Sequence, residues 1–306
     1  MPAPHQTTDP RLYDWLLFLL APLFFSSNLI FGRGISGEVG PFTTALLRWV
    51  GAAILMSPLI WHERRACLAF VRQHTALWLT LGILGMGICG GVVYWALTLT
   101  TASNATLIYT TSSLFIILFQ WLFQKRAITG RELFGMLIAF GGVIAIVLKG
   151  QPEALFELTF NIGDLAILVA AIAFAAYSLL LRRPSVRAMP PLPLFALLAL
   201  SGAIVLIPPG LIEMTSGAPL PDTWMEFAKL AGIILFASLA AFYCFQHAVQ
   251  VFGPGIAGMT LYLMPPMSIL MAVVFLGERF EHYHAIGIVL VTGGLILATA
   301  PRRKTA

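Results

Sequence analysis

Long apolar runs follow one another along almost the whole chain, and only short polar stretches separate them. A helix needs about 20 apolar residues to cross a lipid bilayer, and these runs are close to that length. The 306 residues are 59% hydrophobic and only 10% charged, whereas soluble domains carry about 25% charged residues. The pattern excludes a water-soluble enzyme and a disordered protein. It predicts an all-α integral membrane protein without a separate soluble domain.

The apolar runs predict ten transmembrane helices, several of which begin at a proline or end near a glycine. The first run is interpreted as a retained span, because the polar residues before it include Asp9 and no basic cluster typical of a signal peptide. Three scattered cysteines are too few for a disulfide framework. The expected spans are residues 12–32, 41–61, 76–98, 102–124, 131–148, 162–181, 191–212, 227–249, 255–276 and 284–300.

Basic residues divide unequally between the two faces that ten spans create. Thirteen of the 18 Lys and Arg residues fall on the side of both termini, and four fall on the other side. Because Lys and Arg stay on the cytoplasmic side during insertion, both termini are expected in the cytoplasm. The first set is Arg11, Arg64, Arg65, Arg72, Lys125, Arg126, Arg131, Arg182, Arg183, Arg187, Arg302, Arg303 and Lys304, and the second is Arg33, Lys149, Lys229 and Arg279.

The two halves of the sequence match each other after a shift of 150 to 152 residues. Glycines and charged residues carry this comparison, since alanines and leucines match by chance in such a composition. Residues 1–150 and 151–306 are therefore expected to form two five-helix repeats. Because five is odd, the second repeat would be inserted upside down, as in many secondary transporters. The aligned pairs include Asp14 with Asp164, Gly135 with Gly287, and Gly141-Gly142 with Gly293-Gly294.

Short motifs in a fixed order connect the chain to a known family. They are Leu47-Arg48-Trp49, Gly163-Asp164, Phe174-Ala175-Ala176-Tyr177, Pro265 and Gly277-Glu278. Over essentially its whole length the chain resembles the ten-helix, EamA-type branch of the drug/metabolite transporter superfamily, and within it the bacterial exporters of aromatic amino acids. The resemblance implies a bacterial cytoplasmic-membrane protein. It also implies a central cavity lined by spans one, three, four, six, eight and nine, with spans five and ten at the periphery.

Two ionisable residues within the predicted spans are candidates for a structural or coupling role. Arg48 lies about 10 Å along the second span, where a charge is costly and often functional. It either binds a substrate carboxylate or acts as a structural clamp, and the clamp is favoured because the resemblance places the second span outside the cavity. His247 can exchange a proton near neutral pH, but a polar helix end is the favoured interpretation. Carboxylates such as Asp14 and Asp164 lie only at helix ends, where the helix dipole favours them.

Uncharged polar and aromatic residues cluster in the six spans that the resemblance assigns to the cavity. Hydroxyl and amide groups can hydrogen-bond a zwitterion, and aromatic faces can hold a ring or an ammonium group. The alternative for each Ser or Thr is a hydrogen bond to a carbonyl of its own helix. The expected substrate-binding residues are Ser27, Asn28, Tyr94, Trp95, Thr98, Tyr109, Ser112, Tyr177, Tyr243 and Tyr262.

Prolines interrupt the ninth predicted span. Pro254 lies between two glycines at its start, and Pro265 lies within it. Broken helices line the binding sites of many transporters, but prolines also produce kinks that serve only packing. Both residues are therefore candidates for a hinge.

These features predict a secondary transporter that exports small organic metabolites, with aromatic amino acids as the expected substrates, by alternating access. Facilitation or exchange is simpler than proton coupling, since the predicted spans contain no central carboxylate. We expect no enzymatic activity, cofactor, metal or nucleic-acid partner, and a monomer or homodimer in contact with lipid. An exporter of drugs, nucleosides or other metabolites remains an alternative, as does a non-transporting membrane scaffold or lipid handler.

Overall fold

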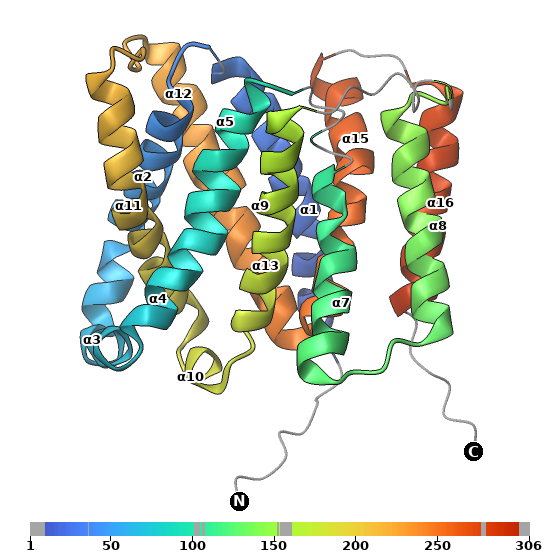
Figure 1. The fold of residues 1–306 in the computed structure, drawn as a ribbon, viewed down its shortest axis with the longest axis horizontal. Coiled ribbons are helices and arrows are strands. Elements are labelled where there is room, and N and C mark those ends of the chain that lie inside the picture. The colour runs from blue at the N-terminus through green and yellow to red at the C-terminus, as the bar shows by residue number, and fades with distance from the viewer. Residues whose placement is uncertain are drawn as a thin grey trace, which may run out of the picture.

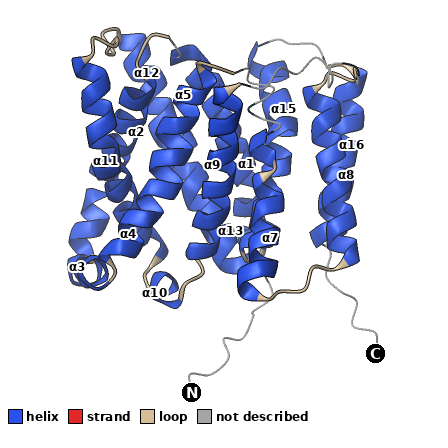
Figure 2. Ribbon diagram, in the orientation of Figure 1, coloured by secondary structure: helices blue, strands red, loops and turns tan. Residues whose placement is uncertain are grey.

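The computed structural model of the chain describes residues 10–35, 37–100, 105, 108–151, 153, 161–276 and 280–299. Over these residues the chain is helical, with no β-strand (Figure 2). The long helices lie side by side along one direction, and the connecting segments gather at the two ends of the bundle (Figure 1). The Gly277-Glu278 motif and the basic residues Arg279, Arg302, Arg303 and Lys304 lie outside the described residues.

Each expected apolar run contains a helix or consecutive helical segments. The third and eighth runs each include a π-helical stretch, η1 and η3, and the ninth includes a 3₁₀ turn, η4. The elements are α1 (Leu12–Ile35), α2 (Pro41–His62), α3 (Arg64–Gln73), α4 (Thr75–Gly82), η1 (Ile83–Val92), α5 (Val93–Leu97), α7 (Ser112–Gln124), α8 (Gly130–Val147), α9 (Ile162–Leu180), α10 (Pro184–Arg187), α11 (Pro191–Thr215), α12 (Trp224–Gly232), η3 (Ile233–Ala240), α13 (Ala241–Phe252), α14 (Pro254–Met259), η4 (Thr260–Leu263), α15 (Met264–Leu276) and α16 (His282–Thr299).

Local sequence explains where several helices begin. The Asn161 side chain accepts a hydrogen bond from the backbone N–H of Asp164, whose carboxylate accepts one from the N–H of Asn161. This capping box satisfies backbone groups that the first turn of α9 leaves unpaired. Thr223 and Glu226 form the same arrangement at α12. Prolines occupy the first turns of α2, α11 and α14, where their missing N–H is harmless.

Six helical runs among the described residues are long and apolar enough to cross a membrane. They are 41–62, 75–97, 130–147, 162–180, 191–215 and 224–252, and three shorter apolar helices cover 12–28, 108–124 and 282–298. The expected ninth span is divided, because α13 ends before Gly253, which has φ +86°, and α14, η4 and α15 follow in turn. The architecture fits a multi-pass integral membrane protein.

The α8 and α16 helices pack closely through glycines. A Cβ atom on Gly135 would lie 2.6 Å from the carbonyl oxygen of Gly294, and one on Gly142 would lie 2.8 Å from that of Gly287. The two backbones therefore touch, as they do in small-residue interfaces between membrane helices. This pair stands at one side of the bundle in Figure 1, with α15 and η4 as neighbours.

The start of α1 and the end of α16 lie at the same end of the bundle as α3 and α10 (Figure 1). We call this the termini end. Arg64, Arg65 and Arg72 belong to α3, and Arg187 belongs to α10. The segment between α7 and α8, which contains Lys125 and Arg126, lies at this end as well (Figure 1). Basic side chains are thus gathered where the sequence places the cytoplasmic face.

Candidate functional site: a cavity between the two halves of the chain

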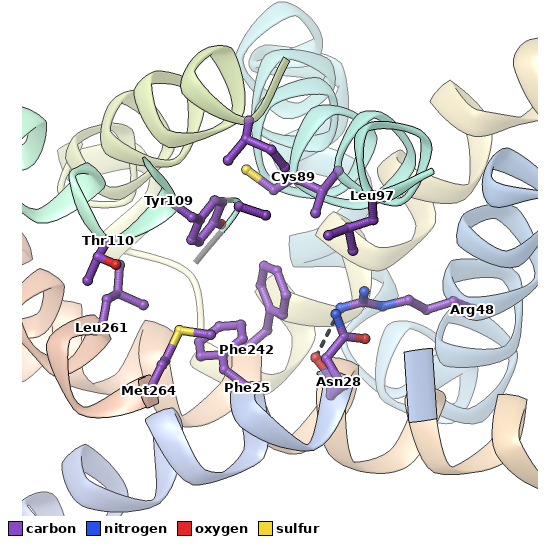
Figure 3. Close-up of a pocket in the computed structure, with 14 residues that line it drawn as sticks. Phe25, Asn28, Arg48, Cys89, Leu97, Tyr109, Thr110, Phe242, Leu261 and Met264 are labelled. Carbon is purple, nitrogen blue, oxygen red and sulfur yellow. Dashed lines mark hydrogen bonds between the residues drawn. The ribbon is translucent and has the colours of Figure 1, made fainter. Parts of the chain in front are cut away.

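Side chains from both halves of the chain enclose a cavity of about 110 Å³ (Figure 3). Elements from all six spans that the resemblance implies contribute to it, and α2 contributes as well. The lining residues are Phe25 and Asn28 of α1, Arg48 of α2, Cys89 of η1, Val93 and Leu97 of α5, Ala105, Tyr109 and Thr110 before α7, Ile167 of α9, Ala237 of η3, Phe242 of α13, Leu261 of η4 and Met264 of α15.

Arg48 is the charged residue among the described residues of the cavity wall, and it is only 3% exposed. Its Nε donates a hydrogen bond to Ser238 Oγ over 2.5 Å, and its Nη2 donates to the carbonyl oxygen of Ala237 over 3.0 Å. The guanidinium also lies 4.9 Å from the centre of the Trp49 ring. Arg48 therefore links α2 to η3. The implied exclusion of the second span from the cavity is corrected, because the same side chain lines the cavity.

A chain of hydrogen bonds continues from Arg48 to α1. Arg48 Nη1 donates to the Tyr94 hydroxyl over 3.1 Å, and that hydroxyl donates to Asn28 Oδ1 over 2.6 Å. Asn28 lies beside the guanidinium at one side of the cavity in Figure 3. Four elements, α1, α2, α5 and η3, thus fix the polar side of the cavity through side chains that are distant in sequence.

The rest of the cavity wall is largely apolar. Cys89, Val93 and Leu97 recur every four residues and so share one helix face. Tyr109 and Thr110 lie across the cavity from Arg48 (Figure 3). No Asp or Glu among the described residues lines the cavity, and no group of three or more His, Cys, Asp and Glu in the described part of the chain is arranged to hold a metal ion. The arrangement can hold a small solute with an anionic end and an apolar body.

A layer of packed aromatic rings lies between the cavity and the termini end. The Phe25 ring contacts Phe242 and Phe245 with centroid distances of 5.3 and 6.0 Å, and Phe174 lies 4.7 Å from Phe245. Tyr177, which is fully buried, accepts a hydrogen bond from Gln246 over 2.8 Å. Packed rings from α1, α9 and α13 therefore close the bundle on this side of the cavity.

Asp14 and His247 form a hydrogen-bonded pair nearer the termini end. Asp14 Oδ1 lies 2.7 Å from His247 Nε2, and the two side chains are only 15% and 18% exposed. The rings of Tyr13 and Tyr243 lie 5.7 and 6.3 Å from the imidazole. His247 therefore joins α13 to α1 through a partner that is 233 residues away.

Arg182, which follows α9, binds the C-terminal end of α13. Its Nη1 donates to the carbonyl oxygens of Val249 and Gln250 at the end of α13, over 3.4 and 3.0 Å. A cation at the C-terminal end of a helix is favoured by the helix dipole. Burial, together with the neighbouring charge of Arg187, lowers the pKa of Arg182 below its ordinary value.

Some of the residues that the sequence predicts for the site lie at the cavity, and others lie elsewhere. Asn28, Tyr109 and Arg48 line the cavity, and Tyr94 bonds to two of them. Trp95 and Thr98 are exposed outside the cavity. The others lie away from the lining: Ser27 bonds to the carbonyl of Phe24, Ser112 and Tyr262 are fully buried, Tyr177 belongs to the aromatic layer, and Tyr243 lies beside His247.

Apolar lining residues are the part of the site that sequence reasoning missed. Phe242 and Met264 are ordinary in a chain of this composition, and so is Ile167. A usable signal was the four-residue spacing of Cys89, Val93 and Leu97, which places one face of the third run toward the cavity.

The broken ninth run contributes two residues to the cavity lining. Pro254 begins α14 and Pro265 lies at the start of α15, with the 3₁₀ turn η4 between them. Leu261 of η4 and Met264 of α15 line the cavity. The interruption lies at the site itself, as broken helices do in transporters.

Comparison with known proteins identifies the family. The model of the EamA-like transporter family matches residues 14–148 and again residues 161–300. The chain belongs to the EamA-like transporter family. A solved crystal structure of a protein with 21% sequence identity superimposes with a TM-score of 0.74, over 95% of this chain and 97% of that one. At this identity the likeness shows the shared fold alone.

Relatives of this EamA-like chain are named as transporters. The uncharacterized transporter YetK of Bacillus subtilis is 23% identical, over 91% of this chain and 84% of its own. An S-adenosylmethionine/S-adenosylhomocysteine transporter of Chlamydia trachomatis is 20% identical over 92% and 86% of the two chains. A probable terminal-alkyne amino-acid exporter of Streptantibioticus cattleyicolor is 24% identical over 74% of each. These names and the family confirm that the chain is a membrane transporter and not an enzyme.

Proposed function

We propose that this EamA-like protein is a secondary transporter that exports small organic metabolites, most of all aromatic amino acids, by alternating access. The observation that carries the proposal is the cavity between the two halves. It combines a buried guanidinium with apolar and aromatic walls. A carboxylate and a hydrophobic side chain are the two chemical features that such walls favour.

The proposed architecture has ten spans in two inverted repeats, residues 1–150 and 151–306. Elements of the two halves begin and end at matching positions, which supports it. The first residues of α7 and α15 are 152 positions apart, and so are their last residues. The π-helical stretches η1 and η3 begin 150 residues apart. The glycine contacts agree as well. Gly135 meets Gly294 while its sequence match, Gly287, meets Gly142, which is the reciprocal pattern of a two-fold interface.

We place both termini in the cytoplasm of a bacterial cell, with the protein in its inner membrane. Support comes from the basic residues of α3 and α10 and of the segment before α8, which lie at the termini end (Figure 1). The positive-inside rule assigns such an end to the cytoplasm. In this orientation the aromatic layer and the Asp14–His247 pair form the cytoplasmic closure of the transport path.

Export then requires that this closure open and the opposite side close. The closure joins α1 to α13, and Gly253 follows the last residue of α13. Its positive φ and the following Pro254 make it a natural hinge. We propose that α1 and α13 separate at the termini end to admit solute from the cytoplasm. The transporter would act as a monomer or homodimer surrounded by lipid.

The substrate class follows from the cavity and from the names of two relatives. Those names refer to an amino acid and to derivatives of methionine and homocysteine. The second candidate is therefore a nucleoside-linked amino acid such as S-adenosylmethionine, which the Chlamydia trachomatis relative favours. Drugs and other metabolites stay open as substrates of the same cavity.

The test is uptake into vesicles reconstituted with the purified protein. We expect labelled phenylalanine, tyrosine or tryptophan to enter faster than into empty vesicles, without added energy, and to equilibrate. S-adenosylmethionine is tested in parallel as the second candidate. Vesicles that take up none of the three aromatic amino acids faster than empty ones would contradict the proposed substrate class. No shift in thermal stability with any solute would favour a non-transporting scaffold instead.

A further inference from the structure

We propose that Arg48 receives the substrate's carboxylate, and that the cavity gives no ionic partner to the amino group. The inference rests on the proposed function and sharpens it, because it makes the carboxylate a requirement for transport and the ammonium group dispensable. The residues that carry it are Arg48, Asn28 and Tyr94 on the polar side, with Tyr109 and Phe242 on the remaining wall.

Arg48 is a buried cation without a counterion in the described structure. Only 3% of it is exposed, and none of the ion pairs among the described residues includes it. Its hydrogen-bond partners, Ser238, Tyr94 and the carbonyl of Ala237, are all neutral. Charge buried without an opposite charge is costly. A carboxylate bound in the cavity that Arg48 lines would supply that opposite charge.

The guanidinium also has donors to spare. It carries five N–H groups, and its contacts with described residues are one bond each from Nε, Nη1 and Nη2. One N–H on each terminal nitrogen is therefore available in a side chain that lines the cavity. Two terminal donors match the two oxygens of a carboxylate.

The surrounding contacts hold these donors in place before a solute arrives. Ser238 and Ala237 fix one edge of the guanidinium, and Tyr94 fixes the Nη1 end. Asn28 Oδ1 is occupied by the Tyr94 hydroxyl, so its amide N–H groups are the part left for the cavity. The polar side therefore offers donors, as an anion requires, and its preorganised geometry lowers the cost of binding.

The rest of the cavity wall differs from the polar side in the groups that it offers to the substrate's amino group. Among the described residues no carboxylate lines the cavity, and Tyr109, Thr110 and Phe242 offer only hydroxyls and ring faces. Such groups hold an ammonium weakly compared with an ion pair. A solute that lacks the amino group but keeps the carboxylate should therefore still bind, whereas the reverse change should abolish binding.

Competition in reconstituted vesicles tests this with the unmodified protein. Uptake of labelled phenylalanine is measured against 3-phenylpropionate, which lacks the amino group, and against phenylalanine methyl ester and 2-phenylethylamine, which lack the carboxylate. We expect 3-phenylpropionate to inhibit within about 10-fold of phenylalanine. The other two should be weaker on the order of 10- to 100-fold, the size of lost charge-assisted hydrogen bonds. Equal inhibition by the acid and its ester would overturn the inference.

Substitution of the arginine gives a second, independent readout. In Arg48→Gln we expect the half-saturating phenylalanine concentration to rise on the order of 10- to 100-fold. The preference for the acid over its ester should disappear in this variant. Arg48→Lys should keep part of that preference. Arg182→Gln is the matched control, since it removes a partly buried arginine that is not among the lining residues and should leave the preference unchanged. An unchanged preference in Arg48→Gln would contradict the inference.

The two proposals fail in different ways. Wild-type vesicles that take up no aromatic amino acid would contradict the proposed function and this inference together. Uptake with no preference for the carboxylate would contradict the inference alone. If Arg48→Gln does not fold, the competition assay on the wild-type protein still tests whether the carboxylate is required.

Discussion

At the scale of single residues, the Asp14–His247 pair joins the first helix to the second half of the chain. Both side chains are largely buried, and the oxygen and nitrogen atoms lie 2.7 Å apart. We expect Asp14→Ala to lower the free energy of unfolding by about 1–3 kcal/mol, because it leaves a buried imidazole without its charged partner. Thermal unfolding in detergent measures this.

The control for that substitution is Asp222→Ala. Asp222 is an exposed acid on the segment before α12, at the other end of the bundle. Its removal should change stability by less than about 0.5 kcal/mol. Equal melting temperatures of the Asp14 variant and the wild-type protein would show that the pair contributes nothing to the closure.

Sequence reasoning identified unusual side chains but not their partners. Arg48 stands out because a charge is rare within an apolar run, and His247 stands out for the same reason. Their partners, Ser238 and Asp14, are separated from them by 190 and 233 residues. Only the packing of distant helices brings these groups together, so no local pattern could assign the clamp or the closure.

At the scale of helices, the apolar runs determine where most elements lie, and interruptions follow from particular residues. Gly253 and Pro254 end α13 where the sequence suggests a break. The π-helical stretches η1 and η3 could not be predicted, because their residues are as apolar as those of the neighbouring turns. Trp95 and Thr98, which follow η1, are exposed instead of lining the cavity.

Adjacent glycines of α8 give a sharp test of the α8–α16 interface. A Cβ atom on Gly142 would lie 2.8 Å from the carbonyl oxygen of Gly287, whereas one on Gly141 would meet nothing within 4 Å. Gly142→Ala should therefore destabilise the protein by about 1–3 kcal/mol, because the backbones must separate. Gly141→Ala should be neutral or stabilise by up to about 1 kcal/mol through helix propensity. Thermal unfolding of the two variants measures the difference, and equal effects would show that this contact does not hold the helices.

At the scale of the whole molecule, the structure is closed at the termini end and has its cavity beyond that closure. The packed rings of Phe25, Phe174 and Phe245 separate the cavity from the Asp14–His247 pair. With the termini in the cytoplasm, as we propose, we infer that in this state the route to the cavity is from the outside. Alternating access then predicts that a group in the cavity reacts from outside and that bound substrate shields it.

Cys89 provides that group, since its thiol lies on the cavity wall while Cys67 and Cys244 are buried elsewhere. In a Cys67→Ser/Cys244→Ser variant, we expect a small membrane-impermeant thiol reagent added to intact cells to modify Cys89. Phenylalanine in the medium should slow the reaction several-fold. The same variant with Cys89→Ser is the control for unspecific labelling. Because the aromatic layer blocks the other route, inverted vesicles should react more slowly than cells. Faster reaction in inverted vesicles would mean that the termini end is the open side, and the proposed orientation or the proposed state would then be wrong.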